Sequence, residues 1–272
     1  MGDSKGGPVY RGLGKIPDRA LLLFAGLVYL FLYAPIMVLI LFSFNSSKST
    51  QVWTGFSTQW YGELIRDGSV LNAFKLSLIV GLTATAIATV IGTLTALALS
   101  RYEFKGKTFA DSAIYATTVM PEIVVGVSLL VFFVAATVEL GIVTIIIAHV
   151  AFCISFVTIV VRARLSGMDR SVEEAAQDLG ATPVQTFLRI TLPLILPGVM
   201  AGALLAFTLS FDDFVITFFV SGVGSSTLPL KLYSMIKFGV SPVINALSTV
   251  VMISTMILIL GGSRFLWRRE DA

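Results

Sequence analysis

Charged side chains are scarce in this sequence of 272 residues, since only 13% are Asp, Glu, Lys or Arg. A soluble domain carries roughly a quarter charged and about 45–50% apolar residues, whereas here the apolar share is 56% and the mean hydropathy is +0.91. Cysteine is nearly absent too: Cys153 stands alone, so no internal disulfide can form. The composition excludes a soluble domain, a disordered chain, a disulfide-rich secreted domain and a nucleic-acid binder with a basic face. It predicts a polytopic membrane protein.

Six apolar segments are long enough to cross a hydrocarbon core, which takes about 20 residues of helix. We therefore expect an all-α protein with six transmembrane helices. The segment 76–99 is rich in Thr, Ala and Gly, which favours a place inside the bundle. The first segment is longer than the core of a signal peptide and has no cleavage signal, so we expect a permanent anchor. The predicted spans are 21–44, 76–99, 112–136, 142–161, 193–220 and 244–267.

The Lys and Arg residues lie mostly on one side of this predicted bundle. Fourteen of the 19 fall in the N-terminal segment, the loops after the second and fourth spans, and the C-terminal tail. By the positive-inside rule both termini are cytoplasmic. The sequence predicts one domain, 21–267, between a cytoplasmic segment 1–20 and a cytoplasmic tail 268–272, with a cytoplasmic loop at 162–192.

That cytoplasmic loop carries the signals of two short helices. Ser171 and Glu174 have the spacing of a capping box, in which each side chain bonds to a free backbone amide. Gly180 is placed to end the first helix in the left-handed conformation. A second capping box lies at 182–185 and includes a proline at the first helical position. We expect the second helix to end before Leu192-Pro193.

The first of these short helices has an apolar stripe at helical spacing, formed by Val172, Ala175, Ala176 and Leu179. So short a helix is marginal in water and needs a packing partner. The stripe packs either on the ends of this protein's own helices or in a groove on another subunit. Periodicity alone leaves both interpretations open.

The loop also carries a longer motif: Glu174-Ala175-Ala176, three residues, Gly180, nine residues, Ile190, one residue, then Leu192-Pro193. This pattern resembles the EAA motif of permease subunits of bacterial ATP-binding-cassette importers. The resemblance implies a type I importer permease fold, and a loop that docks on a cytoplasmic ATPase. It assigns the coupling positions to Glu174, Ala175, Ala176 and Gly180.

The chain shows no nucleotide site of its own. Gly106-Lys107-Thr108 looks like the end of a phosphate-binding loop, but that motif needs a glycine where Arg101 stands. The segment also follows a membrane helix rather than a strand. We therefore expect ATP and Mg²⁺ on a separate partner ATPase and no cofactor in this chain.

Three acidic residues, Glu122, Asp212 and Asp213, fall inside predicted spans. A charge near the bilayer centre costs about 2.5–3.5 kcal/mol on insertion scales, so such residues mark function or pairing. No Lys or Arg lies deep in a span to neutralise them. They line a cation path, or they hold a partner permease. Pro121 suggests a helix interrupted beside Glu122, and the two adjacent aspartates cannot point the same way on a helix.

Several further motifs resemble one branch of these importers, the second permease subunit of the spermidine/putrescine systems. The resemblance implies that Trp60, Glu122, Ser210, Asp212 and Asp213 meet the polyamine. For Trp60, a place in the interfacial aromatic belt is the alternative. The motifs are Tyr33-Ala34-Pro35, Phe42-Ser43-Phe44-Asn45, the stretch 53–66, Met120-Pro121-Glu122, Ser210-Phe211-Asp212-Asp213, Thr227-Leu228-Pro229-Leu230, and Ser241-Pro242 with Asn245-Ala246-Leu247.

Two weaker signals remain. His149 and Cys153 share a helix face, but with no third ligand in view we expect a buried polar contact and no metal site. The external segment 221–241 is a gate or a landing surface for a binding protein, and its sequence does not separate the two.

These observations predict a multi-pass permease subunit of the bacterial inner membrane, without catalytic residues, that translocates putrescine or spermidine. Its expected partners are a second permease, a dimeric ATPase, a periplasmic or tethered polyamine-binding protein and membrane lipid, with no nucleic acid. One alternative is an importer of another solute. The other is an ion-coupled secondary transporter, whose usual inverted repeats are not visible here.

Overall fold

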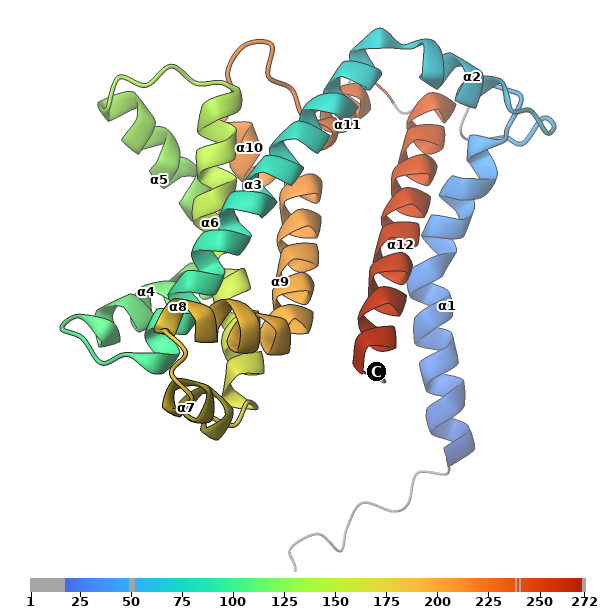
Figure 1. Ribbon diagram of the computed structural model, residues 1–272. Helices are drawn as coiled ribbons and strands as arrows, with labels where there is room; N and C mark the ends of the chain where they lie inside the picture. The colour runs from blue at the N-terminus through green and yellow to red at the C-terminus, as the bar shows by residue number, and fades with distance from the viewer. Residues whose placement is uncertain (1–17, 49–51, 238, 240, 271–272) are drawn as a thin grey trace, which may run out of the picture.

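A computed structural model describes residues 18–48, 52–237, 239 and 241–270, and in this part the chain forms helices joined by loops, with one isolated β-bridge between Asn45 and Phe56 (Figure 1). For 18, 19, 258, 259 and 262–270 only the backbone is described. The predicted cytoplasmic segment therefore lies largely outside the described residues, as does the end of the tail. The elements are α1 Asp18–Ser43, α2 Gln59–Arg66, α3 Gly68–Arg101, α4 Lys107–Val119, α5 Glu122–Ala135, α6 Ile142–Ser166, α7 Ser171–Asp178, α8 Pro183–Thr186, the π-helix η1 Phe187–Thr191, α9 Leu192–Asp212, α10 Val215–Val220, α11 Leu228–Lys237 and α12 Pro242–Glu270.

Three long helices, α3, α6 and α9, pack on one another and form the core. Small residues recur every four positions along α3, and they are buried because this row faces the neighbouring helices. At Gly92 an added Cβ would stand 2.8 Å from the side chain of Val157 on α6, so only glycine allows this approach. The expectation that 76–99 packs inside the bundle is confirmed. The small residues of the row are Ala84, Ala88, Gly92 and Ala96.

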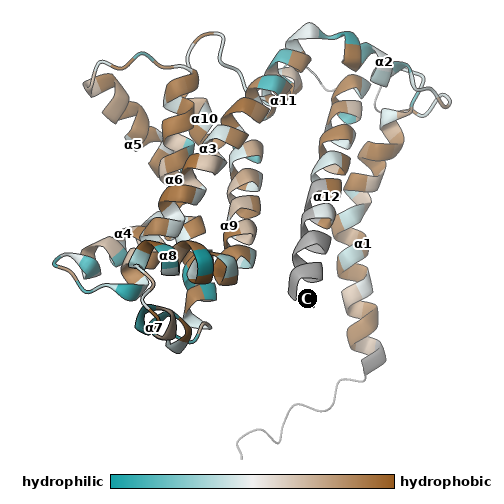
Figure 2. Ribbon diagram, viewed as in Figure 1, coloured by the Kyte–Doolittle hydropathy of each residue, from teal (hydrophilic) through white to brown (hydrophobic). Residues whose placement is uncertain are grey.

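The first and last helices, α1 and α12, pack against each other and stand beside the core rather than within it (Figure 1). Most residues of α1 are apolar, as the view in Figure 2 shows for one side, and none of the residues in its most apolar stretch is buried. A helix that is apolar all round is suited to lipid or to another membrane helix. Outside its contact with α12, the surface of α1 is therefore open to lipid or to a further membrane helix.

Within the described residues, four helices are long and apolar enough to cross a membrane: α1, α3, α6 and the run 183–212. The α4–α5 pair makes a fifth span if its two parts are counted together. In α12 the apolar stretch with described side chains is Pro242–Ile257, shorter than a full span. The count of six spans and their orientation stay predictions.

The third predicted span, 112–136, is not a single helix. It consists of α4 and α5, which meet at an angle of 114°. The break follows from Pro121, which has no N–H to donate and which disfavours helical geometry at Met120. Met120 is accordingly extended, with ψ 133°. The interruption expected at this proline is confirmed, whereas a straight helix over 112–136 is wrong.

The second helix of the cytoplasmic loop was expected to end before Leu192-Pro193, and this is wrong. The chain stays helical from Pro183 through Asp212. The π-helical turn η1 makes this possible, since the N–H of Leu192 donates to the carbonyl of Phe187, five residues back. Pro193 follows directly as the second residue of α9. The fifth predicted span, 193–220, therefore begins earlier and breaks at Asp213.

Candidate functional site

The carboxylate of Asp213 caps the junction between α9 and α10. Asp213 is extended, with ψ 125°, so α9 stops at Asp212 and α10 starts at Val215, after two intervening residues. Its oxygens accept hydrogen bonds from the backbone N–H groups of Ile216 at 3.2 Å and Thr217 at 2.8 Å, and from the Thr217 hydroxyl at 2.8 Å. These N–H groups belong to the first helical turn, which has no intrahelical acceptor for them. Asp213 thus stabilises the break.

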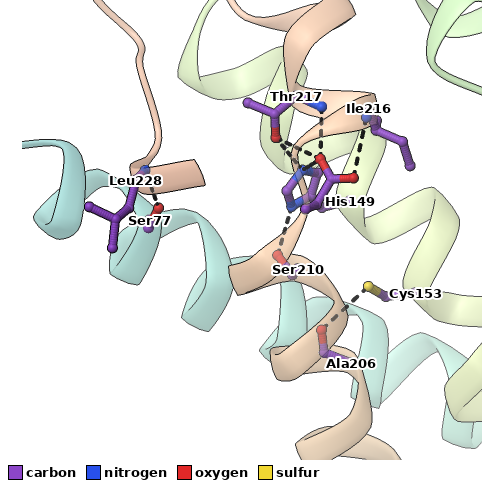
Figure 3. A network of polar contacts seen from close by, with 9 residues as sticks. Ser77, His149, Cys153, Ala206, Ser210, Ile216, Thr217 and Leu228 are labelled. Atoms are coloured by element: carbon purple, nitrogen blue, oxygen red, sulfur yellow. Dashed lines mark hydrogen bonds and ion pairs between the residues drawn. The ribbon is translucent and has the colours of Figure 1, made fainter. Parts of the chain in front are cut away.

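His149 of α6 joins this junction from the side (Figure 3). Its Nδ1 lies 2.7 Å from the Ser210 hydroxyl, and its Nε2 lies 3.0 Å from the Thr217 hydroxyl and 3.2 Å from the Asp213 carboxylate. The His149 and Asp213 side chains are only 2% and 5% exposed. The buried polar contact expected of His149 is confirmed. Within the described ranges, no three His, Cys, Asp or Glu residues gather as a metal site requires.

Asp212 lies next to Asp213 but faces an open space. It lies on the walls of two neighbouring cavities, one of about 720 Å³ and one of about 300 Å³. Among the described residues no side chain makes a hydrogen bond or ion pair with its carboxylate, and it is the only charged residue in either lining. The two acids therefore separate: one is bonded inside the protein and the other faces a cavity.

Glu122 is the first residue of α5 and lies at the other helix break. It is exposed on this chain and within electrostatic range of Asp212 and Asp213. The two breaks are neighbours because α5 packs against α10. Glu122, Asp212 and Asp213 thus come together, and Ser210 joins them through His149.

Trp60 lies apart from this cluster. It is 4% exposed and donates its indole N–H to the backbone carbonyl of Asn45 at 2.5 Å. Together with Leu64 it forms the buried face of α2, an amphipathic helix that follows the loop after α1. Trp60 lines neither cavity, so its contacts are those of a residue that holds this loop.

The coupling positions predicted in the cytoplasmic loop lie on α7 and at its end. Gly180 has φ +88°, its N–H donates to the carbonyl of Gln177, and the N–H of Ala181 donates to the carbonyl of Ala176. This is the Schellman ending expected there. The apolar stripe is not covered by the chain itself, since Leu179 is 90% exposed and Val172 43% exposed.

The start of α7 differs from the expected capping box. The N–H of Ser171 donates to Asp169 at 2.9 Å, and Ser171 and Glu174 do not pair reciprocally. The capping box does not form because Asp169 accepts hydrogen bonds from both the backbone N–H and the hydroxyl of Ser171. These hydrogen bonds, the backbone one foremost, lower the pKa of Asp169. The second box is confirmed: Thr182 and Gln185 exchange hydrogen bonds of 2.9 and 3.3 Å.

Glu173, the residue before the predicted coupling glutamate, ties α7 to the membrane helices. Its carboxylate lies 3.1 Å from Nε of Arg101 at the end of α3 and accepts a hydrogen bond of 2.7 Å from Thr191 in η1. Both ion-pair partners are largely buried, at 12% and 14% exposure. The sequence analysis did not predict a role for Glu173, because its spacing places it on the polar face of the short helix. Arg101 and Thr191, both at predicted helix ends, were the available signal.

Comparison with known proteins agrees with this architecture. Residues 88–265 match the family described as the binding-protein-dependent transport system inner membrane component. Over 245 residues the chain is 47% identical to the putrescine transport system permease protein PotI of Escherichia coli K12, covering 88% of this chain and 86% of that protein. Over 233 residues it is 43% identical to the spermidine/putrescine transport system permease protein PotC of the same strain, covering 86% and 88%.

Solved structures share the fold at low sequence identity. A chain of a bacterial ABC transporter involved in the import of the polysaccharide alginate superposes with a TM-score of 0.74 at 16% identity, covering 95% of this chain and 99% of that one. A chain of the methionine ABC transporter MetNI, in an inward-facing conformation, gives 0.61 at 19% identity, covering 78% and 99%.

A helical membrane chain with two broken helices, a cavity that Asp212 lines and an exposed short helix, α7, has the parts of a transport subunit. The chain belongs to the family of inner-membrane components of binding-protein-dependent transport systems. It is a permease component of the inner membrane and not an ATPase.

Proposed function

We propose that this chain is one of two permease subunits in an ATP-driven importer of polyamines, putrescine or spermidine. The observation that carries the proposal is Asp212, an acid on two cavity walls with no cation among the described lining residues. A carboxylate in such a place favours a cationic substrate. The identity of 47% and 43% to permeases named for putrescine and spermidine supports the same class.

The chemistry of a polyamine suits these cavities. It is an aliphatic chain with an ammonium group at each end, so it needs carboxylates or aromatic rings for the ends and apolar surface for the methylene groups. Asp212 supplies the carboxylate, while Phe74, Phe207 and Phe211 supply rings in the larger cavity. Glu122, close to Asp212 and exposed on this chain, supplies a second carboxylate along the route.

The remaining predicted pathway residues act indirectly in this proposal. Asp213 and Ser210 are bonded to His149, so they hold the α9–α10 junction that presents Asp212 to the cavity. Trp60 fixes the external loop through its bond to Asn45. The substrate then meets Asp212 and Glu122 directly.

The assembly follows from the exposed stripe of α7. We assign this stripe, with Glu174, Ala175, Ala176 and Gly180, to docking on a dimeric ATPase that carries ATP and Mg²⁺. A second permease completes the transmembrane path, and a periplasmic binding protein delivers the polyamine. The chain crosses the membrane six times with both termini in the cytoplasm, which puts α7 on the ATPase side. Closing of the ATPase moves α7, and the permeases turn outward.

The test is ATP-driven accumulation of radiolabelled putrescine in proteoliposomes that hold the chain with its partner subunits and binding protein. We expect accumulation that needs ATP, stops with an ATPase-dead partner, and is not restored by an imposed ion gradient. Accumulation driven by a proton or sodium gradient with the dead ATPase would contradict the proposal and favour a secondary transporter. ATP-driven uptake of another solute, with none of putrescine or spermidine, would favour the other alternative.

A further inference from the structure

The smaller cavity, of about 300 Å³, lies between α11 and the α9–α10 junction. The part of α11 that lines it is a stripe at helical spacing, which repeats every three to four residues. One face of α11 therefore covers Asp212, at the point where α9 ends. The lining residues of α11 are Leu228, Pro229, Leu232, Tyr233 and Ile236.

The start of α11 is fixed to the core. The backbone N–H of Leu228 donates a hydrogen bond of 2.8 Å to the hydroxyl of Ser77 on α3, and both partners are buried (Figure 3). Since α3 is a core helix, this bond fixes where the lining stripe begins. The cavity is thus bounded by anchored elements on the α3 side and at the junction.

Aromatic rings form one side of this cavity. The ring of Tyr233 lies 4.7 Å from that of Phe214, centroid to centroid, and both residues are in the lining. Phe218 supports them from outside the lining, with its centroid 5.6 Å from Phe214 and 6.4 Å from Tyr233. Tyr233 remains 46% exposed, so much of its ring is free of protein contacts.

The charge at this cavity is negative. Asp212 is the only charged residue in its described lining, although α11 carries two lysines. Lys231 interacts electrostatically with Asp67 at the start of α3, and Lys237 does not contribute to the lining. The basic residues of α11 therefore lie off the face that covers Asp212.

The two cavities share part of their walls, including Asp212. Their linings share four residues, and one of these is Asp212, which carries the carboxylate. Because Asp212 lines both cavities, a cation that moves from the smaller cavity into the larger one stays beside the same carboxylate. The shared residues are Phe211, Asp212, Leu232 and Val251.

We propose that the smaller cavity is a binding subsite for a primary ammonium group, in which the ring face of Tyr233 and the carboxylate of Asp212 hold the cation together. An ammonium over an aromatic face gains from the ring quadrupole, and the gain grows as water is excluded. Tyr233 is then a substrate-contacting residue on the external helix, and α11 is part of the substrate route. This inference rests on the proposed function, since it names where one amine of that substrate binds.

The test measures the KM and maximal rate of putrescine uptake by the reconstituted transporter with variants at Tyr233. We expect Tyr233→Leu to raise KM about three- to tenfold with the maximal rate and the amount of chain unchanged, as loss of one cation–π contact implies. Tyr233→Phe keeps the ring and is expected within about twofold of wild type. The matched control is Phe218→Leu, which loses a ring of the same cluster outside the lining.

A graded series makes the test specific for the ring face. Replacing Tyr233 by phenylalanine with one, two and three ring fluorines weakens the ring quadrupole with little change of shape. We expect KM to rise with each fluorine, which a purely structural role of the ring would not produce. A flat series, or equal effects of Tyr233→Leu and Phe218→Leu, would overturn the subsite. Wild-type uptake of putrescine under ATP alongside a flat series rejects the subsite alone, whereas no ATP-driven polyamine uptake by wild type rejects the proposed function.

Discussion

Two regions of this chain treat their polar and apolar groups in opposite ways. At the α9–α10 junction every group of the cluster finds its partner inside the chain: the Asp213 carboxylate, the His149 ring and the Ser210 and Thr217 hydroxyls bond to one another. On α7 the apolar stripe lies open, and Leu179 is 90% exposed. The polar groups of the junction are bonded within the single chain, whereas the apolar stripe of α7 is left uncovered by it. Substitutions in the junction should therefore affect folding, and those on α7 should affect assembly.

The largest effect is expected from His149→Ala. Removing this buried ring leaves the Asp213 carboxylate and the Ser210 and Thr217 hydroxyls without their shared partner and opens a cavity, and each buried polar group left unsatisfied costs about 1–3 kcal/mol. We expect a large fall in the amount of folded chain in the membrane, measured by size-exclusion chromatography after detergent extraction. Cys153→Ala is the matched control, since Cys153 is buried one turn further along α6 and makes only a weak contact to Ala206. Normal amounts of the His149 variant would show that the junction does not depend on this cluster.

The α7 stripe is tested with Ala175→Trp, which adds bulk at an exposed position. We expect normal amounts of folded chain, with loss of co-purifying ATPase and at least a tenfold fall in uptake. The control Lys105→Trp adds the same bulk to the exposed loop between α3 and α4. Retained ATPase in the Ala175 variant would mean that the stripe is not the docking face.

A smaller effect is expected from Glu173→Gln. The substitution removes the charge that binds Arg101 and accepts from Thr191, and hydrogen bonds to charged groups are worth about 1.5–3 kcal/mol. The variant should assemble, but it should hydrolyse more ATP per putrescine transported, as measured by parallel hydrolysis and uptake assays. Glu103→Gln is the control, because Glu103 pairs with Lys107 on the surface at 89% exposure, where ion pairs contribute little. An unchanged ratio of ATP hydrolysed to putrescine transported in Glu173→Gln would show that the contacts of Glu173 with Arg101 and Thr191 do not couple α7 to the membrane helices.

The smallest effect concerns pH at the start of α3. Asp67 accepts hydrogen bonds from the N–H groups of Ser69 and Val70, and hydrogen bonding by Ser69 lowers the pKa of Asp67 below its usual 3.8. Because the folded-state pKa is depressed, the stabilisation is present above that usual value and is lost as the pH falls through the lower one. Hydrogen exchange should show that protection at these two amides persists at pH 3.8 and is lost as the pH falls further, through the lowered pKa, and the same loss at neutral pH in Asp67→Ala. Unchanged protection in that variant would contradict the cap.

Much of this architecture could be predicted from local sequence. The length of the apolar segments predicted the long helices. Pro121 predicted the break between α4 and α5, and Gly180 predicted the end of α7. The errors arose where two local signals compete. Asp169 accepts a hydrogen bond from Ser171, which therefore does not form the expected capping box with Glu174. A π-helical turn allows the helix to continue beyond Pro193.

The candidate site was less predictable because it depends on contacts between distant segments. His149 and Asp213 are 64 positions apart, and Arg101 and Glu173 are 72 apart, so periodicity gives no information on either pair. The sequence did indicate that the two adjacent acids point different ways. It did not indicate that Asp213 is the bonded one, since that depends on a histidine from another helix.

The most direct measurement compares putrescine uptake per assembled complex in Asp212→Asn and in Asp213→Asn. The account predicts that Asp212→Asn assembles in normal amounts yet transports at least tenfold less. It predicts that Asp213→Asn lowers the amount of folded chain, while the molecules that do assemble keep most of their transport. Normal transport by assembled Asp212→Asn would contradict the account at its centre.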